Sequence, residues 1–177
     1  MKISIIIPTL NEKDYLPRLI NSIKKHTSIS KRDYELIVVD GGSIDNTVSI
    51  ARKLVNKVVV LKKRGIGFAR NKGVKVASGD YLFFIDADTI IENDVITAMY
   101  TRMKESKRPM CGTVNMRVRL SGLTPRLIFA YINFVHKLLA CFWPFAFGAF
   151  IFVDKNYLMQ FAVLGRIWMV MKIMILL

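Results

Sequence analysis

Residues 81–89 read YLFFIDADT, and this stretch decides the fold. Tyr81–Ile85 is a continuous apolar run, the pattern of a strand buried on both faces, and two carboxylates follow it, Asp86 and Asp88. Buried carboxylates need a positive partner, because otherwise their pKa values rise. The stretch therefore predicts a central strand that brings two acids to one edge of a sheet, together with a positive group that balances them.

The sequence before this stretch alternates between apolar runs and amphipathic segments. The expected strands are Ile3–Ile7, Leu36–Val39, Val58–Leu61 and Tyr81–Ile85. The expected helices are Glu12–His26, Asp45–Val55, Phe68–Ala77 and Glu92–Glu105. This alternation predicts an α/β fold with a mostly parallel central sheet, right-handed crossovers and helices on both faces.

Polar residues follow three of the four expected strands. They are Pro8-Thr9-Leu10-Asn11-Glu12, Asp40-Gly41-Gly42-Ser43 and Asp86-Ala87-Asp88. Ligands of such sheets bind beyond the carboxyl ends of the strands, so these residues predict a binding site there. Helix capping by Ser43 and Asp45 explains part of the pattern, but it does not explain why Asp40, Asp86 and Asp88 should converge on one edge.

The D-x-D pair suggests a metal. Two carboxylates at a strand end can hold Mg²⁺ or Mn²⁺, which prefer oxygen ligands and are often shared with substrate phosphates. Such an ion would balance Asp86 and Asp88 and would stabilise a departing diphosphate as a Lewis acid.

The stretch GIGFARNKG (65–73) comes close to a dinucleotide-binding fingerprint. It departs from that fingerprint because Arg70 stands at the third glycine position and a Lys/Arg run precedes it in place of a first strand. We interpret it as a glycine-rich turn that lets the backbone and Arg70 approach a phosphorylated ligand.

The formal net charge is +14 and the composition is 53% hydrophobic. A basic balance favours polyanionic partners, namely nucleic acid, anionic lipid or a phosphorylated small molecule. No nucleic-acid-binding module is present and the basic stretches are short, so no nucleic-acid partner is predicted. Cys111 and Cys141 lack metal-type spacing and are expected to be reduced thiols, which places the chain in the cytoplasm.

We divide the chain into a core (1–120), an apolar segment (121–153) and a hydrophobic tail (154–177). Within the core, Met110–Leu120 alternates as an antiparallel strand would. His136, Lys137, Pro144 and Gly148 interrupt the apolar segment, and a spanning helix needs roughly 20 apolar residues. We therefore expect an amphipathic helix lying on the cytoplasmic face of an anionic membrane; a helix buried against the core is the alternative.

Four motifs resemble, in order and spacing, the family 2 glycosyltransferases of the GT-A fold. They are IIPTLNE (6–12), VVDGGSIDNT (38–47), GFARNKG (67–73) and ASGDYLFFIDADT (77–89). The resemblance covers residues 1–153 and implies transfer of a sugar from a nucleotide-diphosphate donor, with Mg²⁺ or Mn²⁺, to a lipid-linked or glycan acceptor. PFAFGAFIFV (144–153) is similar to the strand on the acceptor side of membrane-associated members.

The resemblance also implies residue roles. Asp88 would be the metal ligand, Asp86 would lie near the ribose and the metal, Asp40 would contact the base and Arg70 would lie beside the nucleotide. The donor-binding set is Pro8, Thr9, Asn11, Glu12, Asp40, Gly41, Arg70 and Asp86. Ile44 departs from the family, which commonly has Thr or Ser at this position.

A larger departure concerns the general base. Family members carry a Gly-Gly-Phe turn and a Glu-Asp pair beyond the acceptor strand, and an acid there deprotonates the acceptor hydroxyl. Here no Asp or Glu follows Asp154, which ends a strand too early to be that base, so the base is missing. A base normally contributes roughly 10²- to 10⁴-fold, so the resemblance predicts donor binding with little transfer. The alternatives are a nucleotide-sugar-binding remnant and a peripheral membrane-binding module.

The tail itself suggests an explanation. Read one nucleotide earlier, the codons of Met171–Ile175 encode Glu-Asp-x-Asp when Lys172 is AAG. We therefore hypothesise that the residues after about Val163 are out-of-frame translation of an originally longer transferase.

Overall fold

The computed structural model describes residues 2–62, 64–114, 149–163 and, between them, 124, 127, 128, 130, 131, 134 and 135. For residues 161–163 it describes the backbone alone. The expected strand beyond Thr113, the rest of the apolar segment and the tail after Val163 lie outside these residues.

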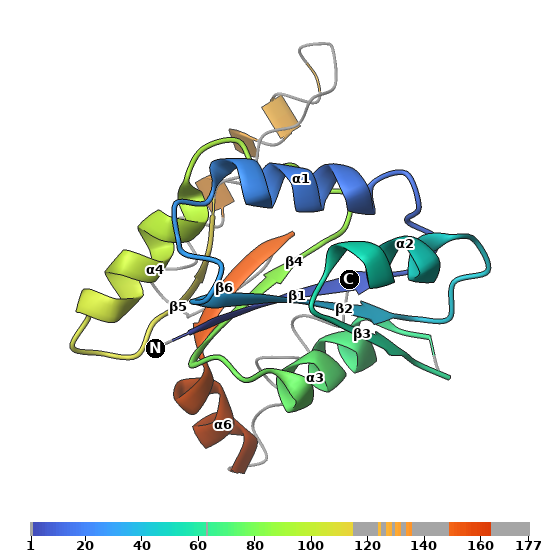
Figure 1. Cartoon of the computed structure of the whole chain (residues 1–177). Coiled ribbons are helices and arrows are strands. Elements are labelled where there is room, and N and C mark those ends of the chain that lie inside the picture. The colour runs from blue at the N-terminus through green and yellow to red at the C-terminus, as the bar shows by residue number, and fades with distance from the viewer. Residues whose placement is uncertain are drawn as a thin grey trace.

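A six-stranded sheet in the order β3-β2-β1-β4-β6-β5 forms the centre of the molecule (Figure 1). The strands are β1 (Ile3–Thr9), β2 (Tyr34–Asp40), β3 (Lys57–Val60), β4 (Tyr81–Ile85), β5 (Cys111–Thr113) and β6 (Phe150–Asp154). The first four are parallel, while β6 runs antiparallel to both β4 and β5. We call the edge where β1, β2 and β4 end the carboxyl edge, and the opposite one the amino edge.

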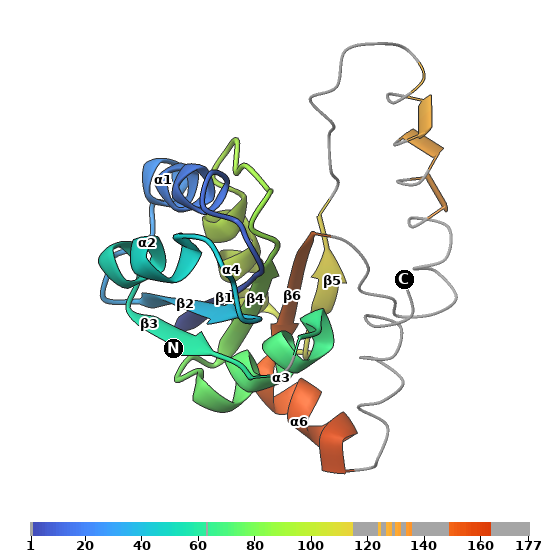
Figure 2. The same cartoon turned by 90° about the vertical axis from the view of Figure 1, so that its right-hand side faces the viewer.

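Helices cover both faces of the sheet, as Figure 2 shows. They are α1 (Leu16–His26), α2 (Thr47–Leu54), α3 (Ile66–Val76), α4 (Val95–Glu105) and α6 (Lys155–Val163). Ile3, Ile5 and Ile7 of β1 pack in one core with α1, α2 and α4. Ile6 points to the other face and packs in a second core with residues of α3 and α6. The period-2 alternation of β1 thus joins two helical layers through one buried strand.

The expected α/β architecture is confirmed, with two corrections in detail. β3 was expected to be buried on both faces, but it is an edge strand that pairs with β2 alone, and Lys57 and Val60 at its ends are exposed. The first expected helix begins at Leu16 rather than at Glu12, with Pro17 in its first turn, a position that proline favours. Residues 10–15 are therefore free to form part of a site.

The apolar segment and β6 add two observations. Residues 124, 127, 128, 130, 131, 134 and 135 are helical. In the part of the chain that the structure describes, no helix is both long and apolar enough to cross a membrane. β6 closes the sheet beside β4 so that Phe150 pairs with Ile85 and Asp154 pairs with Tyr81.

Candidate active site

A cavity of about 320 Å³ lies at the carboxyl edge of the sheet. It opens between the ends of β1, β2 and β4 and the beginning of α3, where α/β sheets bind their ligands. Its lining residues are Pro8, Thr9, Leu10, Glu12, Gly41, Gly65, Ile66, Ala69, Asp86, Ala87 and Asp88. The cavity therefore combines an acidic side with an apolar side.

The loops after β1 and β2 hold each other by reciprocal hydrogen bonds. The Asn11 amide donates to Ser43 Oγ (2.8 Å), and the Ile44 amide donates to Asn11 Oδ1 (2.9 Å). Asn11 has a positive φ of 59°, a conformation that asparagine tolerates better than most residues. The sequence predicted Asn11 as a donor-binding residue; in the structure it is exposed, does not line the cavity and connects the two loops.

A second pair of bonds extends this connection to the start of both helices. The Glu12 amide donates to Thr47 Oγ1 (2.8 Å), and that hydroxyl donates in turn to Asp45 Oδ1. The Lys13 amide donates to Asp45 Oδ2 (3.3 Å). Ser43 and Asp45 were expected to cap α2; the N-cap is Asn46, which makes no side-chain capping bond, but Asp45 Oδ1 accepts from the amide of Thr47, the first residue of the helix (2.9 Å). Ser43 and Asp45 also hold the chain on either side of Glu12 through the amides of Asn11 and Lys13.

Asp40 lies beneath the cavity floor and is fully buried. The amides of Gly42 and Ser43 donate to its Oδ1 (2.9 and 2.8 Å), and the hydroxyls of Thr9 and Ser43 donate to its Oδ2 (3.0 and 2.5 Å). A buried carboxylate needs such donors in place of water. The carboxylate thereby fixes Thr9 and presents Gly41 to the cavity.

Helix α3 approaches β1 closely because its inner face is made of small residues. A Cβ on Gly73 would overlap Ile6 Cγ2, so only glycine fits there without a shift. Gly67, Ala69 and Gly73 are buried on this face. The interpretation of residues 65–73 as a glycine-rich turn was wrong beyond its first residue: Gly65 is the turn, with a φ of 137°, and the helix begins at Ile66.

Arg70 supplies the positive charge that Asp86 needs. Its Nη2 lies 2.8 Å from Asp86 Oδ1, and the two side chains are 5% and 28% exposed. Burial raises the pKa of Asp86, the charge and the hydrogen bond of Arg70 offset part of that rise, and Asp88 adds to it. From the sequence we expected a metal ion to balance both Asp86 and Asp88. For Asp86 the protein already provides a cation of its own.

Asp88 and Glu12 complete the acidic side of the cavity. Asp88 is exposed and Glu12 is half-buried. Burial raises the pKa of Glu12, and the negative charges of Asp88, Asp45 and Asp86 raise it further. Three carboxylates therefore face one cavity, and a cation or a hydrogen-bond donor entering it would relieve their repulsion.

A divalent cation suits these carboxylates only if a bound phosphorylated ligand coordinates it as well. Among the described residues, no group of three or more His, Cys, Asp or Glu side chains is arranged to hold a metal ion. Mg²⁺ is commonly held by one or two carboxylates together with substrate phosphates, and Asp88 with Asp86 provides that number. The residues present therefore suit an ion that arrives with a phosphorylated ligand.

Asp154 lies at the opposite end of the sheet from the cavity. It pairs with Tyr81 at the start of β4, and its Oδ1 accepts hydrogen bonds from the amides of Asn156 and Tyr157 (2.9 and 3.2 Å). As expected, Asp154 ends a strand. Its position at the amino edge, where it caps α6, removes it from any chemistry in the cavity.

Six of the nine predicted site residues line the cavity: Pro8, Thr9, Glu12, Gly41, Asp86 and Asp88. Asp40 and Arg70 are buried outside the lining, and Asn11 is exposed outside it. The apolar residues of the lining were not predicted from the sequence; they are Leu10, Gly65, Ile66, Ala69 and Ala87. These residues sit between or next to the predicted ones, so adjacency to a motif was the signal that could have found them.

The structure defines the chain as an α/β protein with a cavity at the carboxyl ends of parallel strands. A family model described as "Glycosyl transferase family 2" matches residues 4–165. The chain belongs to this family.

Curated relatives match over part of their length. The poly(ribitol-phosphate) beta-glucosyltransferase of Bacillus spizizenii is 35% identical over 114 residues, which are 60% of this chain and 18% of that protein. A PGL/p-HBAD biosynthesis glycosyltransferase of Mycobacterium tuberculosis is 37% identical over 123 residues, 64% of this chain and 47% of that protein. The chain thus spans less than half the length of these relatives.

Solved structures share the fold. TarS 1–349 of S. aureus in complex with UDP-GlcNAc has a TM-score of 0.61 and 31% identity over 70% of this chain and 37% of that one. The Pyrobaculum calidifontis mannosyltransferase PcManGT, in complex with GDP-Man and Mn²⁺, has a TM-score of 0.71 and 21% identity over 90% of this chain and 46% of that one. At that identity the second likeness concerns the fold alone.

Proposed function

We propose that this chain is the donor-binding part of a glycosyltransferase that moves a sugar from a nucleoside diphosphate to an acceptor hydroxyl. The observation that carries the proposal is the cavity at the carboxyl edge, into which β4 brings Asp86 and Asp88. The likeness to TarS, which was solved with UDP-GlcNAc, supports a nucleotide sugar as the ligand.

In this proposal the two sides of the cavity hold different parts of the donor. The apolar side, with Leu10 and Ile66, suits the flat nucleobase, while the acidic side suits the ribose hydroxyls and the diphosphate with its cation. Pro8, Thr9, Glu12, Gly41 and Asp86 would contact the donor directly. Asp40 and Arg70, which belong to the same predicted set, would act from behind the wall, and Asn11 would act by holding the loop after β2.

Asp88 would hold Mg²⁺ or Mn²⁺, with Asp86 beside it. When bound, such an ion stabilises the negative charge of a departing diphosphate. The reaction is a displacement at the anomeric carbon: the acceptor oxygen forms the new bond, the bond to the diphosphate breaks, and the acceptor proton passes to a base. The residues of this chain orient the donor for that step, and proximity of this kind can lower a barrier by roughly 7–11 kcal/mol.

The general base is the point on which a second candidate function depends. Among the described residues, the acid that follows α4 is Asp154, which lies at the amino edge and cannot reach the cavity. A chain without the base would bind nucleotide sugars and transfer them slowly. This favours a catalytically impaired nucleotide-sugar-binding protein as the alternative.

Calorimetry and a turnover assay separate the two candidates. The full chain is titrated with UDP- and GDP-sugars in the presence of Mn²⁺, and consumption of the same donors is followed in parallel. Binding with turnover at ordinary enzyme rates supports the transferase, whereas binding without turnover supports the impaired binder. Absence of binding to either nucleotide contradicts both.

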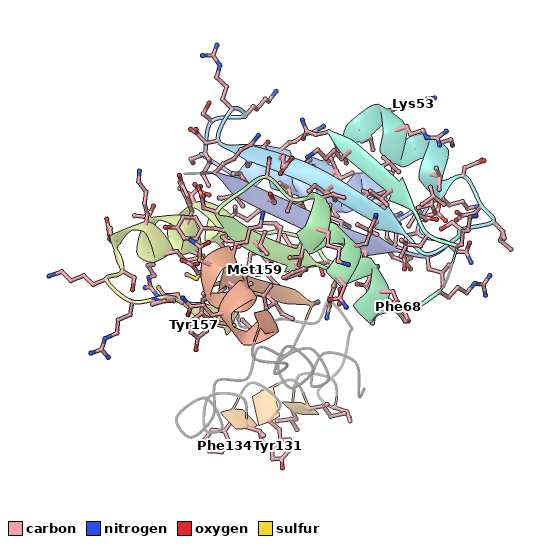
Figure 3. The ribbon with its side chains drawn as sticks, turned by 90° about the horizontal axis from the view of Figure 1, so that it is seen from below. Lys53, Phe68, Tyr131, Phe134, Tyr157 and Met159 are labelled. Atoms are coloured by element: carbon pink, nitrogen blue, oxygen red, sulfur yellow. The ribbon has the colours of Figure 1, made fainter. Side chains whose placement is uncertain are left out.

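We also propose that the acceptor is a lipid-linked molecule or a glycan. The chain would bind it at the cytoplasmic face of an anionic membrane. Leu127, Ile128, Tyr131 and Phe134 are exposed, at 59, 51, 68 and 63%, and lie at helical spacing. In Figure 3, Tyr131 and Phe134 point away from the sheet. An exposed apolar helix face on a chain of net charge +14 is typical of a protein that binds an anionic membrane surface.

Vesicle sedimentation tests this part separately. The full chain should bind vesicles containing phosphatidylserine more strongly than neutral ones, and binding should weaken with salt. The double change Tyr131→Ser and Phe134→Ser should reduce binding, while Asp88→Asn should leave it unchanged. Equal binding by the Ser variant would show that this face does not meet the membrane.

The out-of-frame origin of the tail remains a proposal, because residues 164–177 lie outside the described ones. The composition of the tail supports it: Met169, Met171 and Met174 occur there without any acid. Sequencing the gene and the DNA downstream tests it. Glu-Asp codons in the shifted frame are expected, and their absence would contradict the proposal.

A further inference from the structure

Arg70 is buried because of where α3 lies. Gly73, one turn further along the helix, allows α3 to touch Ile6 of β1, and this close approach of the helix to the sheet buries Arg70 as well. Arg70 is 4% exposed. Its neighbour Ala69 lines the cavity, but Arg70 does not. A ligand in the cavity would therefore meet the wall in front of Arg70 rather than the guanidinium itself.

The contact that Arg70 makes fixes one oxygen of Asp86 and leaves the other available. Nη2 donates to Oδ1 at 2.8 Å, and the Asp86 amide donates to the Ala149 carbonyl oxygen at 2.9 Å. Within the described residues, Asp86 Oδ2 has no hydrogen-bond partner. The backbone of Asp86 is thus held by Ala149, the residue before β6, and its carboxylate by α3, while Oδ2 keeps its lone pairs for a ligand.

The guanidinium does not hold Asp86 as a two-pronged fork. Its Nε is buried and has no hydrogen-bond partner in the described structure. An unpaired buried donor is unfavourable by roughly 1–3 kcal/mol, so this arrangement is not the one that stability alone would select. The contact with Asp86 needs one charged donor at the position of Nη2, and the ammonium group of a lysine could supply it.

We propose that Arg70 is a positioning residue of the donor site: it holds the carboxylate of Asp86 in the orientation that a nucleotide–metal ligand requires and does not touch that ligand. Binding groups must be held within about 0.5 Å of their productive position, and a half-exposed aspartate without a partner would sample several rotamers. This inference rests on the proposed function for its ligand, and it reassigns Arg70 from contact with the nucleotide to support of Asp86.

A double-mutant cycle with UDP and Mn²⁺ as the probe tests the proposal by calorimetry. Arg70→Met should weaken binding about tenfold in the wild-type background and less than twofold in the Asp86→Asn background, because its effect passes through Asp86. Arg70→Lys should stay within threefold of wild type. The matched control is Lys72→Met, on the exposed side of the same helix, which should not alter affinity.

Two outcomes would overturn the proposal. An equal loss for Arg70→Met in both backgrounds would mean that Arg70 touches the nucleotide, and no loss in the wild-type background would mean that it has no role in binding. Thermal unfolding identifies any variant that is not folded. If Arg70→Met is not folded, Arg70→Lys, which keeps the charge, is compared with wild type instead. A tenfold loss of UDP affinity in Arg70→Lys would then count against the proposal.

A second readout needs no ligand and so separates this proposal from the proposed function. Three-bond couplings to Cγ of Asp86 report its χ1 rotamer in solution. One rotamer should dominate in wild type and in Arg70→Lys, and rotamer averaging should occur in Arg70→Met. A single rotamer in Arg70→Met would overturn the positioning role whether or not the chain binds UDP.

Discussion

Glu35, which is buried at the amino edge of the sheet, and the carboxylates that line the cavity at the carboxyl edge are paired in opposite ways. At the amino edge, Glu35 accepts hydrogen bonds from Ser4 Oγ (2.6 Å) and from the amide and hydroxyl of Ser78 (both 2.7 Å), and Lys57 Nζ lies 3.1 Å from its Oε2. Burial alone would raise the pKa of Glu35, but these donors hold it at about 2. This carboxylate is fully engaged with the protein.

At the carboxyl edge Asp40 is also buried and accepts four hydrogen bonds, but the acids that line the cavity are left incompletely paired. The pKa values of Glu12 and Asp86 are raised, by burial first, and Asp88 is exposed beside them. The amino edge thus uses a carboxylate to join β1, β2 and the turn before β4, whereas the carboxyl edge keeps carboxylate oxygens open to a cavity. The difference separates groups that stabilise the fold from groups available to a ligand.

The largest effect is expected from Glu35→Gln, which removes the charge at the amino edge. Lowering a pKa from 4.5 to about 2 corresponds to roughly 3 kcal/mol, so the free energy of unfolding at pH 7 should fall by about that amount. Because the folded pKa is depressed, this contribution is complete above pH 4.5 and is lost as the pH falls towards 2.

Urea unfolding at pH 7 and at lower pH values checks this prediction. Wild type should lose stability between about pH 4.5 and 2, and the Glu35→Gln variant should show a much smaller loss over that range. Lys57→Met is the matched control, since it removes the more exposed partner and should have a smaller effect. A Glu35→Gln variant as stable as wild type would mean that the network does not stabilise the fold.

Asp88→Asn should have the next largest effect, and it should act on binding. Contacts to charged groups contribute about 1.5–3 kcal/mol, so the affinity for UDP with Mn²⁺ should fall roughly 30-fold. The melting temperature should not fall, since Asp88 is exposed. Asp33→Asn, an exposed aspartate at the amino edge, is the control for calorimetry; an equal loss in that variant would remove the distinction between the edges.

Glu12→Gln should stabilise the fold slightly while it weakens donor binding. Its raised folded pKa means that the charged form opposes folding above that pKa, so removing the charge should increase the free energy of unfolding at pH 7. The gain should disappear as the pH falls to 4.5 and below. Thermal unfolding at two pH values measures it, and a destabilised variant would show that Glu12 makes a favourable contact in the folded protein.

Ile44→Thr should have the smallest effect. Ile44 departs from the family pattern, yet its side chain is 87% exposed and its contribution to the loop is the bond from its amide to Asn11. Exposed substitutions of this kind usually change stability by less than ~0.5 kcal/mol. Stability and UDP affinity should both match wild type, and a clear change in affinity would show that this side chain reaches the donor.

The sequence predicted the fold well because the apolar runs of β1, β2 and β4 are continuous and the acids stop them. It also predicted that Asp40, Asp86 and Asp88 converge, since parallel strands end at one edge. It could not separate ligand-facing residues from buried ones. The burial of Arg70 depends on how closely α3 approaches Ile6, and that distance depends on the tertiary packing of Gly73 against Ile6.

The same limit applies to Asp40. Its carboxylate accepts three hydrogen bonds from the loop after β2 and one from Thr9 of β1, and that loop is bonded to Asn11, about thirty residues away in the sequence. A motif identifies which residues gather at a site. It does not say which of them form the surface and which form the support, because that depends on packing between elements.

Paramagnetic broadening by Mn²⁺ tests the central contrast most directly. The backbone amide resonances of the full chain are recorded with Mn²⁺ alone and with Mn²⁺ and UDP together. On addition of UDP, the signals of Thr9, Gly41 and Ala87 around the cavity should broaden selectively, while those of Ser78 and Gly79 at the amino edge should remain sharp. Broadening centred on the amino edge, or no selective broadening when UDP is present, would contradict the assignment of the carboxyl edge as the donor site.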